Sequence, residues 1–175
     1  MNEAAASAIY LRALRLAGVY REDSVGRILT LLEEAAAFDH PEACFELANW
    51  RQLGIGAARD EAAAVALWER AFAGGHAEAG LRLANAYERG AGVERNDARA
   101  FLLYEQCALA GSVSAYYELG RCKYYGLGTN VDRAGAAAAF AQARRCGHAE
   151  ALCDAAESDG PRRMPLPEVI VATRA

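Results

Sequence analysis

Three histidines are the first residues of this 175-residue sequence to consider for chemistry, because imidazole is a common metal ligand. Each begins a similar tetrapeptide, HPEA at 40–43 and HAEA at 76–79 and 148–151. The tetrapeptides start 36 and then 72 residues apart, so His40, His76 and His148 occupy one position of three different repeated units. Packed helices are separated by about 8–10 Å, whereas zinc ligands lie about 2 Å from their ion. The spacing therefore predicts structural histidines and no metal site.

The glycine and serine motifs of known catalytic sites are missing from the sequence. Three Gly-x-Gly pairs, at 54/56, 90/92 and 126/128, follow expected helices and lack the third glycine of a dinucleotide-binding loop. Neither a GxxxxGK phosphate-binding motif nor a GxSxG nucleophile motif occurs. The repeat also brings no histidine, carboxylate and nucleophile together. We therefore expect no catalytic residue, no cofactor and no enzymatic activity, with a hydrolase as the remote alternative.

The five cysteines favour reduced thiols, since their number is odd and no CxxC pair occurs. Cys146 and Cys153 could approach each other across a turn, but a disulfide needs Cα atoms within about 7 Å. Because Cys107 shares its repeat position with Ala71 and Ala143, we expect buried or partly buried thiols. The N-terminus lacks the pattern of a signal peptide, and no apolar run of about 18 residues occurs. A cytoplasmic protein without a membrane span is the expectation.

Composition limits the classes of partner. Hydrophobic residues make up 54% and charged residues 24% of the chain, which is typical of one globular domain with a buried core. The net charge is −4 and the isoelectric point is near 5.5, whereas a general nucleic-acid or anionic-membrane binder needs a basic face. We therefore expect neither a nucleic-acid partner nor insertion into a membrane.

A repeat of 36 residues organises the chain. Besides the histidines, the positions that recur include Leu47/Leu83/Leu119, Trp68/Tyr104/Phe140 and Gly75/Gly111/Gly147. The period defines a degenerate unit at about 4–39, clear units at 40–75, 76–111 and 112–147, and a half unit at 148–158. Residues 159–175 contain three of the four prolines and form an extended tail. We expect this tail to cap the last unit, to lie loose or to bind a partner.

Each unit contains two expected helices separated by a glycine-rich turn. The first runs from about Pro41 to Leu53, and Gly54 follows where a left-handed cap ends a helix. The second begins after a residue type that favours helix N-caps, in the four units Ser24, Asp60, Asn96 and Asp132. One such helix pair cannot bury its apolar face alone. We therefore predict an all-α, right-handed α/α solenoid of about four 36-residue helix-turn-helix repeats, with a trailing helix and the extended C-terminal tail.

The repeated pattern resembles Sel1-like repeats, which are relatives of tetratricopeptide repeats. The unit at 76–111 matches best, with Ala79, Leu83, Ala84, Tyr87, Gly90, Gly92, Val93, Asn96, Ala100, Tyr104, Cys107, Ala108 and Gly111. The other clear units depart from it at the tyrosine position, where they have Arg51 and Lys123, so the helix packing there is open. The resemblance implies a scaffold or adaptor that gathers partner proteins, often in bacteria.

The resemblance also implies a concave face lined by the first helix of each pair. Its inward positions outside the core are Phe45/Leu81/Tyr117, Asn49/Asn85/Arg121, Gln52/Glu88/Tyr124 and Leu53/Arg89/Tyr125. Asparagine amides can both donate to and accept from a peptide backbone, an arginine can pair with a carboxylate, and tyrosines supply contact area. The alternative is that these positions are ordinary solvated helix residues, or core residues in the case of some tyrosines.

The expected function is protein–protein binding by a small cytoplasmic bacterial adaptor or scaffold, whose concave groove takes a peptide or helix of a partner. The alternative is a dedicated neutralising, immunity-type or regulatory partner of one protein. An adaptor should bind several ligands with micromolar affinity, whereas an immunity protein should bind one ligand at nanomolar or lower Kd. The sequence leaves the partner, the pathway and the oligomeric state open.

Overall fold

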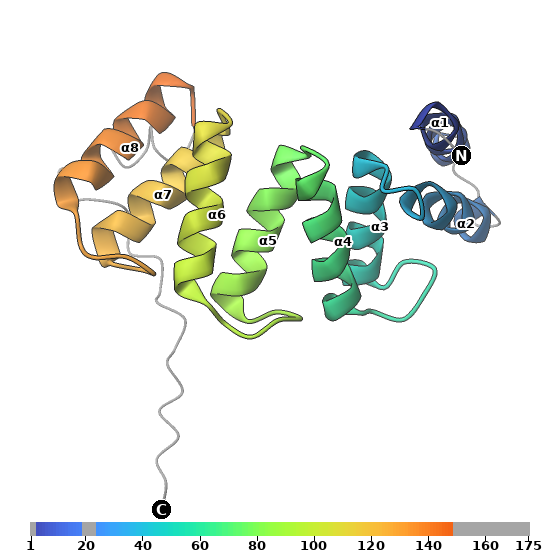
Figure 1. Ribbon diagram of the computed structural model, residues 1–175, viewed down its shortest axis with the longest axis horizontal. Coiled ribbons are helices and arrows are strands. Elements are labelled where there is room, and N and C mark those ends of the chain that lie inside the picture. Colours follow the sequence, from blue (N-terminus) through green and yellow to red (C-terminus); the bar gives the residue numbers. More distant parts are fainter. Residues whose placement is uncertain (1–2, 19–23, 149–175) are drawn as a thin grey trace, which may run out of the picture.

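The computed structural model describes residues 3–18 and 24–148 as α-helices joined by short turns, without a strand in these ranges (Figure 1). The eight helices of this part are α1 Glu3–Ala17, α2 Val25–Ala36, α3 Pro41–Leu53, α4 Glu61–Ala73, α5 Ala77–Arg89, α6 Asp97–Leu109, α7 Val113–Tyr125 and α8 Arg133–Arg145. The predicted all-α repeat architecture is confirmed for the described residues.

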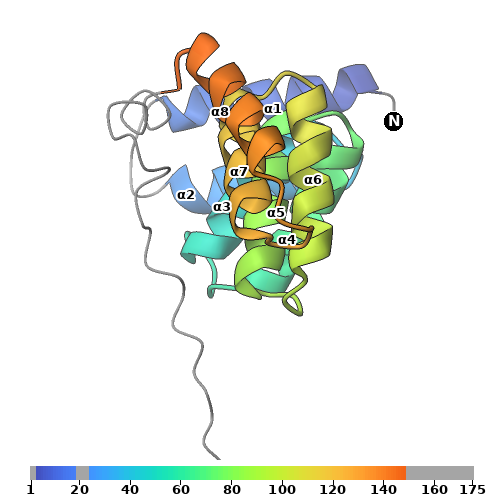
Figure 2. The same ribbon diagram turned by 90° about the vertical axis from the view of Figure 1, so that its left-hand side faces the viewer.

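The helices stack in chain order. They follow one another across Figure 1 from α1 and α2 on the right to α8 on the left, and Figure 2 looks along the stack from the α8 end. Each helix packs against its neighbours in the sequence, within a hairpin and between hairpins. Most buried residues of α1 to α7 form one continuous core cluster, and Tyr117 of α7 packs with Ala143 of α8 in a second, smaller one. The molecule is therefore held together by local contacts, as in other helical repeat proteins.

The core combines alanines with one aromatic residue in the second helix of each clear unit. Ala64 and Ala71 are fully buried in α4, with Trp68 between them at 3% exposure. The same positions of α6 are Ala100, Tyr104 and Cys107, all at most 2% exposed. Alanines allow the helix backbones to approach closely, while the aromatic ring fills the space between neighbouring helices. The pattern predicted from the repeat is confirmed at these positions.

The first helices of the clear units begin at side-chain caps. The backbone N–H of Ala43 donates to Nδ1 of His40, and that of Ala79 donates to Nδ1 of His76, at 3.3 and 3.2 Å. In α7 the hydroxyl of Ser112 takes this role. The two histidines thus satisfy backbone donors at helix starts, which gives them a structural role.

The second helices begin at Asp60, Asn96 and Asp132, whose side chains accept from the third residue of their helices as predicted. The prediction of a Ser24 cap on α2 is wrong. Ser24 has helical φ and ψ of −89° and −18°, and its side chain makes no capping hydrogen bond. An N-cap side chain reaches the helix N–H groups from an extended backbone, which Ser24 does not adopt.

Gly54, Gly90 and Gly126 end the first helices in the left-handed conformation, with φ of 72°, 69° and 73°. This agrees with the sequence, because glycine adopts that conformation without a Cβ penalty.

The cysteines are buried in three of the four described cases. Cys44, Cys107 and Cys122 lie in the core, whereas Cys146 is exposed, so the expectation of a buried or partly buried thiol is wrong there. Cys146 follows the last residue of α8, where no further described helix covers it. Its predicted neighbour Cys153, the rest of the half unit 148–158 and the tail 159–175 lie outside the described residues. None of the described helices has the length and hydropathy needed to cross a membrane.

Candidate partner-binding surface

A pocket of about 290 Å³ opens between α3, α4 and α5. Its lining consists of Gln52, Arg59, Glu61, Trp68, Arg82, Asn85, Ala86, Arg89 and Ala91. Three of the residues predicted to bind a partner, Gln52, Asn85 and Arg89, therefore meet at one place. They come from two successive first helices, α3 and α5, which both line the pocket.

The helices α3 and α5 position the polar groups of the pocket. Arg82, Asn85 and Arg89 follow one another at intervals of three and four residues, so they share one face of α5. Gln52 reaches the pocket from the last turn of α3. The apolar part of the lining is buried, because Trp68 is 3% and Ala86 is 4% exposed. The pocket thus has a rigid apolar base and a rim of amide and guanidinium groups.

The asparagines at this surface make internal hydrogen bonds. Nδ2 of Asn85 donates to the carbonyl oxygen of Leu81 at 3.2 Å, and Oδ1 of Asn49 accepts from the indole N–H of Trp68 at 3.4 Å. Each amide group has further donor or acceptor capacity beyond one bond. The amides are therefore held in fixed orientations while part of each can still bind a ligand.

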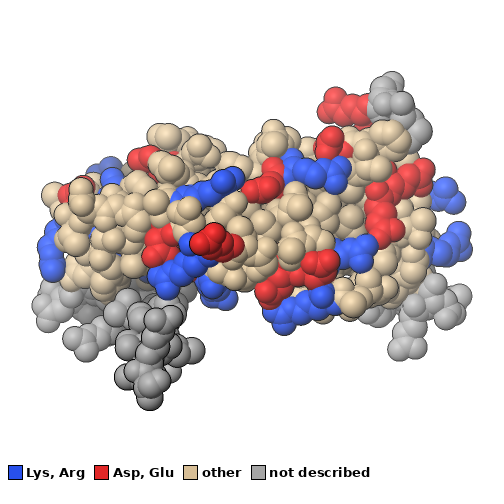
Figure 3. Space-filling view, turned by 60° about the horizontal axis from the view of Figure 1, so that its bottom comes forward, with Lys and Arg blue, Asp and Glu red and all other residues tan. Residues whose placement is uncertain are grey.

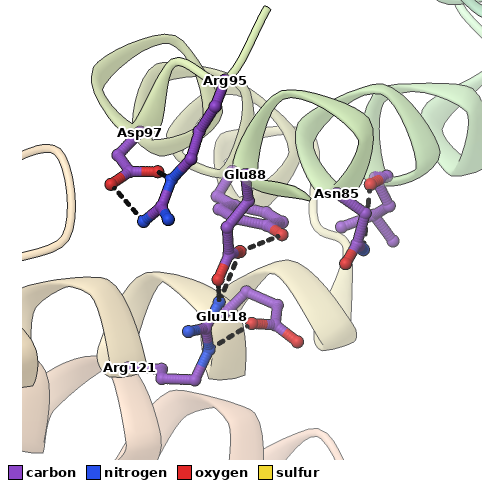
Figure 4. A network of polar contacts seen from close by, with 8 residues as sticks. Asn85, Glu88, Arg95, Asp97, Glu118 and Arg121 are labelled. Atoms are coloured by element: carbon purple, nitrogen blue, oxygen red, sulfur yellow. Dashed lines mark hydrogen bonds and ion pairs between the residues drawn. The ribbon is translucent and has the colours of Figure 1, made fainter. Parts of the chain in front are cut away.

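A network of charged residues lies next to the pocket, between α5, α6 and α7 (Figure 4). The Arg121 guanidinium donates to both carboxylate oxygens of Glu88, at 2.7 and 2.6 Å, and to Glu118 at 2.8 Å. The hydroxyl of Tyr104 donates to Glu88 at 3.1 Å. The carboxylate predicted for Arg121 is thus supplied by the chain itself.

The network shifts the pKa values of two of its members, Arg121 and Tyr104. Burial lowers the pKa of Arg121, but the carboxylates of Glu118 and Glu88 outweigh this effect and raise it above its ordinary value. Burial, assisted by the same two carboxylates, raises the pKa of the Tyr104 phenol strongly. Arg121 therefore remains a cation and Tyr104 a neutral donor, and both are engaged in packing α5, α6 and α7 together.

Three other predicted residues contribute to the packing of neighbouring hairpins. Leu81 and Tyr117 are only 8% and 7% exposed, so both belong to the core of the described chain. The Tyr117 ring packs against Phe140, with 5.5 Å between centroids. Phe45 is half-buried and stacks on the ring of His76 at 4.1 Å. Phe45 thus packs against the start of the following hairpin, whereas Tyr117 packs against α8 of its own hairpin.

The predicted tyrosines at the end of α7 form a separate aromatic group. Tyr124 and Tyr125 are half-buried and contact each other edge-on, with 5.0 Å between centroids. The Arg133 guanidinium lies 4.9 Å from the centre of the Tyr124 ring and donates to its hydroxyl. The predicted residues thus divide into the pocket, the Arg121 network, this tyrosine group and the hairpin contacts.

Residue types alone did not identify Arg59, Arg82 and Trp68 as pocket residues, or Glu118 and Tyr104 as members of the network. For Arg82 and Glu118 the signal lies in their shared repeat position, because the second residue of the pair is opposite in charge to the first.

The charges on the hairpin-turn side of the molecule are mixed. Figure 3 shows basic and acidic side chains next to one another over this face, without a single broad patch of one sign. No group of three or more possible metal ligands occurs within residues 3–18 and 24–148. The charges of this face are therefore balanced locally and create no broad field of one sign.

Comparisons with known proteins agree with the architecture. In structure, 81% of the chain matches a protective antigen of uropathogenic Escherichia coli strains that displays an SLR fold, with a TM-score of 0.77 and 22% identity. A Sel1 repeat protein from Oxalobacter formigenes matches over the same share, with the same TM-score and identity. The matched parts are 31% of the first protein and 59% of the second, so the chain spans less than two thirds of either. At this identity the likeness shows the fold.

Among curated proteins, none matches the chain in sequence. The family model of the Sel1 repeat matches residues 41–76, 77–112 and 113–148, which together make up more than half of the chain. Sel1 repeats are generally protein-interaction modules with a non-enzymatic repeat scaffold. From the three matched repeats and the shared fold, the chain belongs to the Sel1 repeat family.

Proposed function

We propose that the chain is a non-enzymatic protein-interaction module that binds a peptide or helix of a partner across α3 and α5. The observation that carries the proposal is the pocket, where Gln52, Asn85 and Arg89 meet over a buried base of Trp68 and Ala86. Six of its nine lining residues are polar or charged, and such groups can fix the orientation of a bound ligand over the apolar base.

The contacts around the pocket support this choice of surface. Phe45, Leu81, Tyr117 and Arg121 are engaged within the chain, whereas Arg89 is exposed and has no ion-pair partner among the described residues. Arginines at the rim of a pocket can bind a partner through several donors at once. The tyrosine group of Tyr124 and Tyr125 could extend the contact along α7.

The test is capture of partner proteins from a lysate of the source organism, with purified protein as bait. The variant carries Gln52→Ala, Asn85→Ala and Arg89→Ala, and the matched control carries Gln106→Ala and Arg144→Ala, two exposed positions away from the pocket. We expect one or a few proteins to be held by wild type and control and lost by the variant. Equal capture by the variant, or no capture by wild type, would contradict the proposal.

A further inference from the structure

The internal repeat supplies a second copy of the pocket for comparison. Every pocket residue has a counterpart 36 positions later, and the pairs with a polar member are Gln52/Glu88, Arg59/Arg95, Glu61/Asp97, Trp68/Tyr104, Arg82/Glu118, Asn85/Arg121 and Arg89/Tyr125. The counterparts include the members of the charged network between α5, α6 and α7 (Figure 4). The same place in the repeat is thus a pocket between α3, α4 and α5, which we call the open copy. Between α5, α6 and α7 it is an ion-pair network, which we call the closed copy.

In the closed copy, a carboxylate occupies the place between the helices. The Glu88 carboxylate accepts two hydrogen bonds from Arg121 and one from Tyr104, and the side chains of Glu88 and Arg121 are only 19% and 17% exposed. The repeat architecture therefore accommodates a carboxylate at this position when donors surround it.

In the open copy, neither of the two carboxylates of the network has an equivalent, and one of the two positions holds an arginine. Gln52 stands where the closed copy has Glu88, and Arg82 stands where it has Glu118. The lining contains three arginines and one acidic residue, Glu61, so its formal charge is +2. Glu61 pairs with Arg59 at the rim, in the same way as Asp97 pairs with Arg95 in the closed copy.

The other two arginines of the open copy can still bind an anion. Arg82 uses Nε to contact Glu78 at 3.3 Å, in an i,i+4 pair whose side chains are half exposed. Exposed pairs of this kind contribute little to stability, so the Arg82 guanidinium can exchange Glu78 for another carboxylate. Arg89 has no ion-pair partner in the described part of the chain. The side-chain amides of Gln52 and Asn85 can donate beside these two guanidinium groups. No carboxylate of the described chain stands at the position of Glu88 to accept from them.

We infer that this pocket receives the carboxylate of one aspartate or glutamate side chain from an acidic partner peptide, which replaces the carboxylate that Glu88 supplies in the next repeat. The inference rests on the proposed function and names the chemistry of the partner at that site. The side chain, rather than a free C-terminus, is the predicted source because the occupant of the closed copy is a glutamate side chain. The volume of about 290 Å³ is at the lower end of ligand pockets and suits one side chain.

The test is selection from two libraries of short random peptides, one displayed as internal segments and one with free C-termini. We expect wild type to enrich internal peptides with aspartate or glutamate at one fixed position. Exchange of that residue for its amide should weaken binding about tenfold, which is the loss of one charge-assisted pair. Added salt should also weaken binding, because part of the attraction is between charges near solvent.

Two variants locate the site. Gln52→Glu places a carboxylate in the pocket at the position of Glu88 and should abolish the acidic preference, and Arg89→Ala should weaken it. The matched control Gln106→Glu makes the same change on an exposed residue of α6 and should bind as wild type does. Thermal unfolding of each variant verifies that the fold is retained.

Other outcomes overturn the inference in distinct ways. Enriched peptides without a fixed acidic position, or an acidic preference that Gln52→Glu leaves unchanged, would contradict the inference and leave the proposed function standing. Enrichment confined to the free C-terminal library would show that the ligand is a terminal carboxylate instead. No enrichment in either library would also overturn the inference, and the lysate capture described above would then decide the proposed function separately.

Discussion

At the scale of single residues, one pair of repeat positions joins neighbouring hairpins at two junctions, through a donor and a glutamate. The Tyr87 hydroxyl donates to Glu69 at 3.1 Å, and Arg51, at the position of Tyr87, donates to Glu33. The departure from the repeat pattern at Arg51 therefore preserves the contact, because arginine and tyrosine both donate to the glutamate 18 residues earlier. The sequence alone left the helix packing at Arg51 undecided, and the structure explains it by this contact with Glu33.

The first residue-scale prediction concerns the network around Arg121. Glu88→Gln removes the charge of the carboxylate that accepts two hydrogen bonds from Arg121. The change should lower the free energy of unfolding by about 1–2 kcal/mol. This value lies between those of exposed and buried pairs, as expected for side chains that are 17% and 19% exposed. Glu78→Gln, in the exposed pair with Arg82, should cost about 0.3–0.5 kcal/mol. Urea unfolding measures both, and equal losses would contradict the role of the network.

The second residue-scale prediction concerns the thiols. Burial raises the pKa of Cys107 to about 11 and that of Cys122 to about 12, whereas Cys146 is exposed. A thiol reagent at pH 8 should therefore modify Cys146 in the folded protein and reach Cys107 and Cys122 only after unfolding. Mass spectrometry of the labelled peptides identifies the modified residues. Rapid labelling of Cys107 in the folded protein would show that α5 and α6 are not packed as described.

The same pKa values set a dependence of stability on pH. Because the folded-state pKa of these thiols is raised, the stability from keeping them neutral is fully present below their unfolded pKa of about 8.5. It should be lost as the pH rises toward about 11. Chemical unfolding at pH 8 and pH 10.5 measures the loss, and Cys107→Ala should reduce the difference between the two.

At the scale of helices and turns, glycines determine how closely one hairpin approaches the next. A Cβ built at Gly92 would lie 2.3 Å from the carbonyl oxygen of Glu61, and one at Gly128 would lie 2.0 Å from that of Asp97. Each hairpin turn therefore rests directly on the start of the second helix in the preceding unit. These glycines are needed for the close approach as well as for their positive φ.

The element-scale prediction separates these two effects. Gly111 has a φ of 88° with open space around it, so Gly111→Ala should lower the free energy of unfolding only by the conformational cost of about 1–2 kcal/mol. Gly92→Ala has the same kind of backbone cost and adds a collision with the backbone of α4, so it should cost clearly more. Thermal or urea unfolding compares the two variants. A smaller loss for Gly92→Ala would mean that the turn does not rest on α4.

Helix positions and turns were predictable from the sequence because they depend on local residue types. Gly54 and Asp60 act through their own backbone conformation and the nearest N–H groups, and both behave as predicted. The candidate site was predictable only in part, because its side-chain partners lie on other helices. Tyr117 packs against Phe140 of α8, and Arg121 pairs with Glu88 of the preceding unit. Arg82 was missed because its importance follows from comparison with Glu118.

At the scale of the whole molecule, the stack gives similar helix pairs different surface chemistry. The scaffold of capped helices and alanine-rich contacts is nearly the same from α3 to α8. Substitutions at a few positions then leave one junction open, between α3 and α5, and close the next with ion pairs. Repeat proteins use extended surfaces of this kind for binding. The surface around the open junction is therefore the one proposed to bind a partner.

Site-specific photo-cross-linking tests this assignment most directly. Leu53 and Leu109 are 68% and 83% exposed, and each is the last residue of its helix. Leu53 ends α3, which lines the pocket, and Leu109 ends α6, which does not. A photoreactive amino acid replaces either leucine, and the protein is irradiated in lysate of its own organism. We expect cross-links to one or a few proteins from position 53. These cross-links should be lost when Gln52→Glu is added, and the same proteins should not be cross-linked from position 109. The same proteins cross-linked from position 109, and not from position 53, would contradict the assignment.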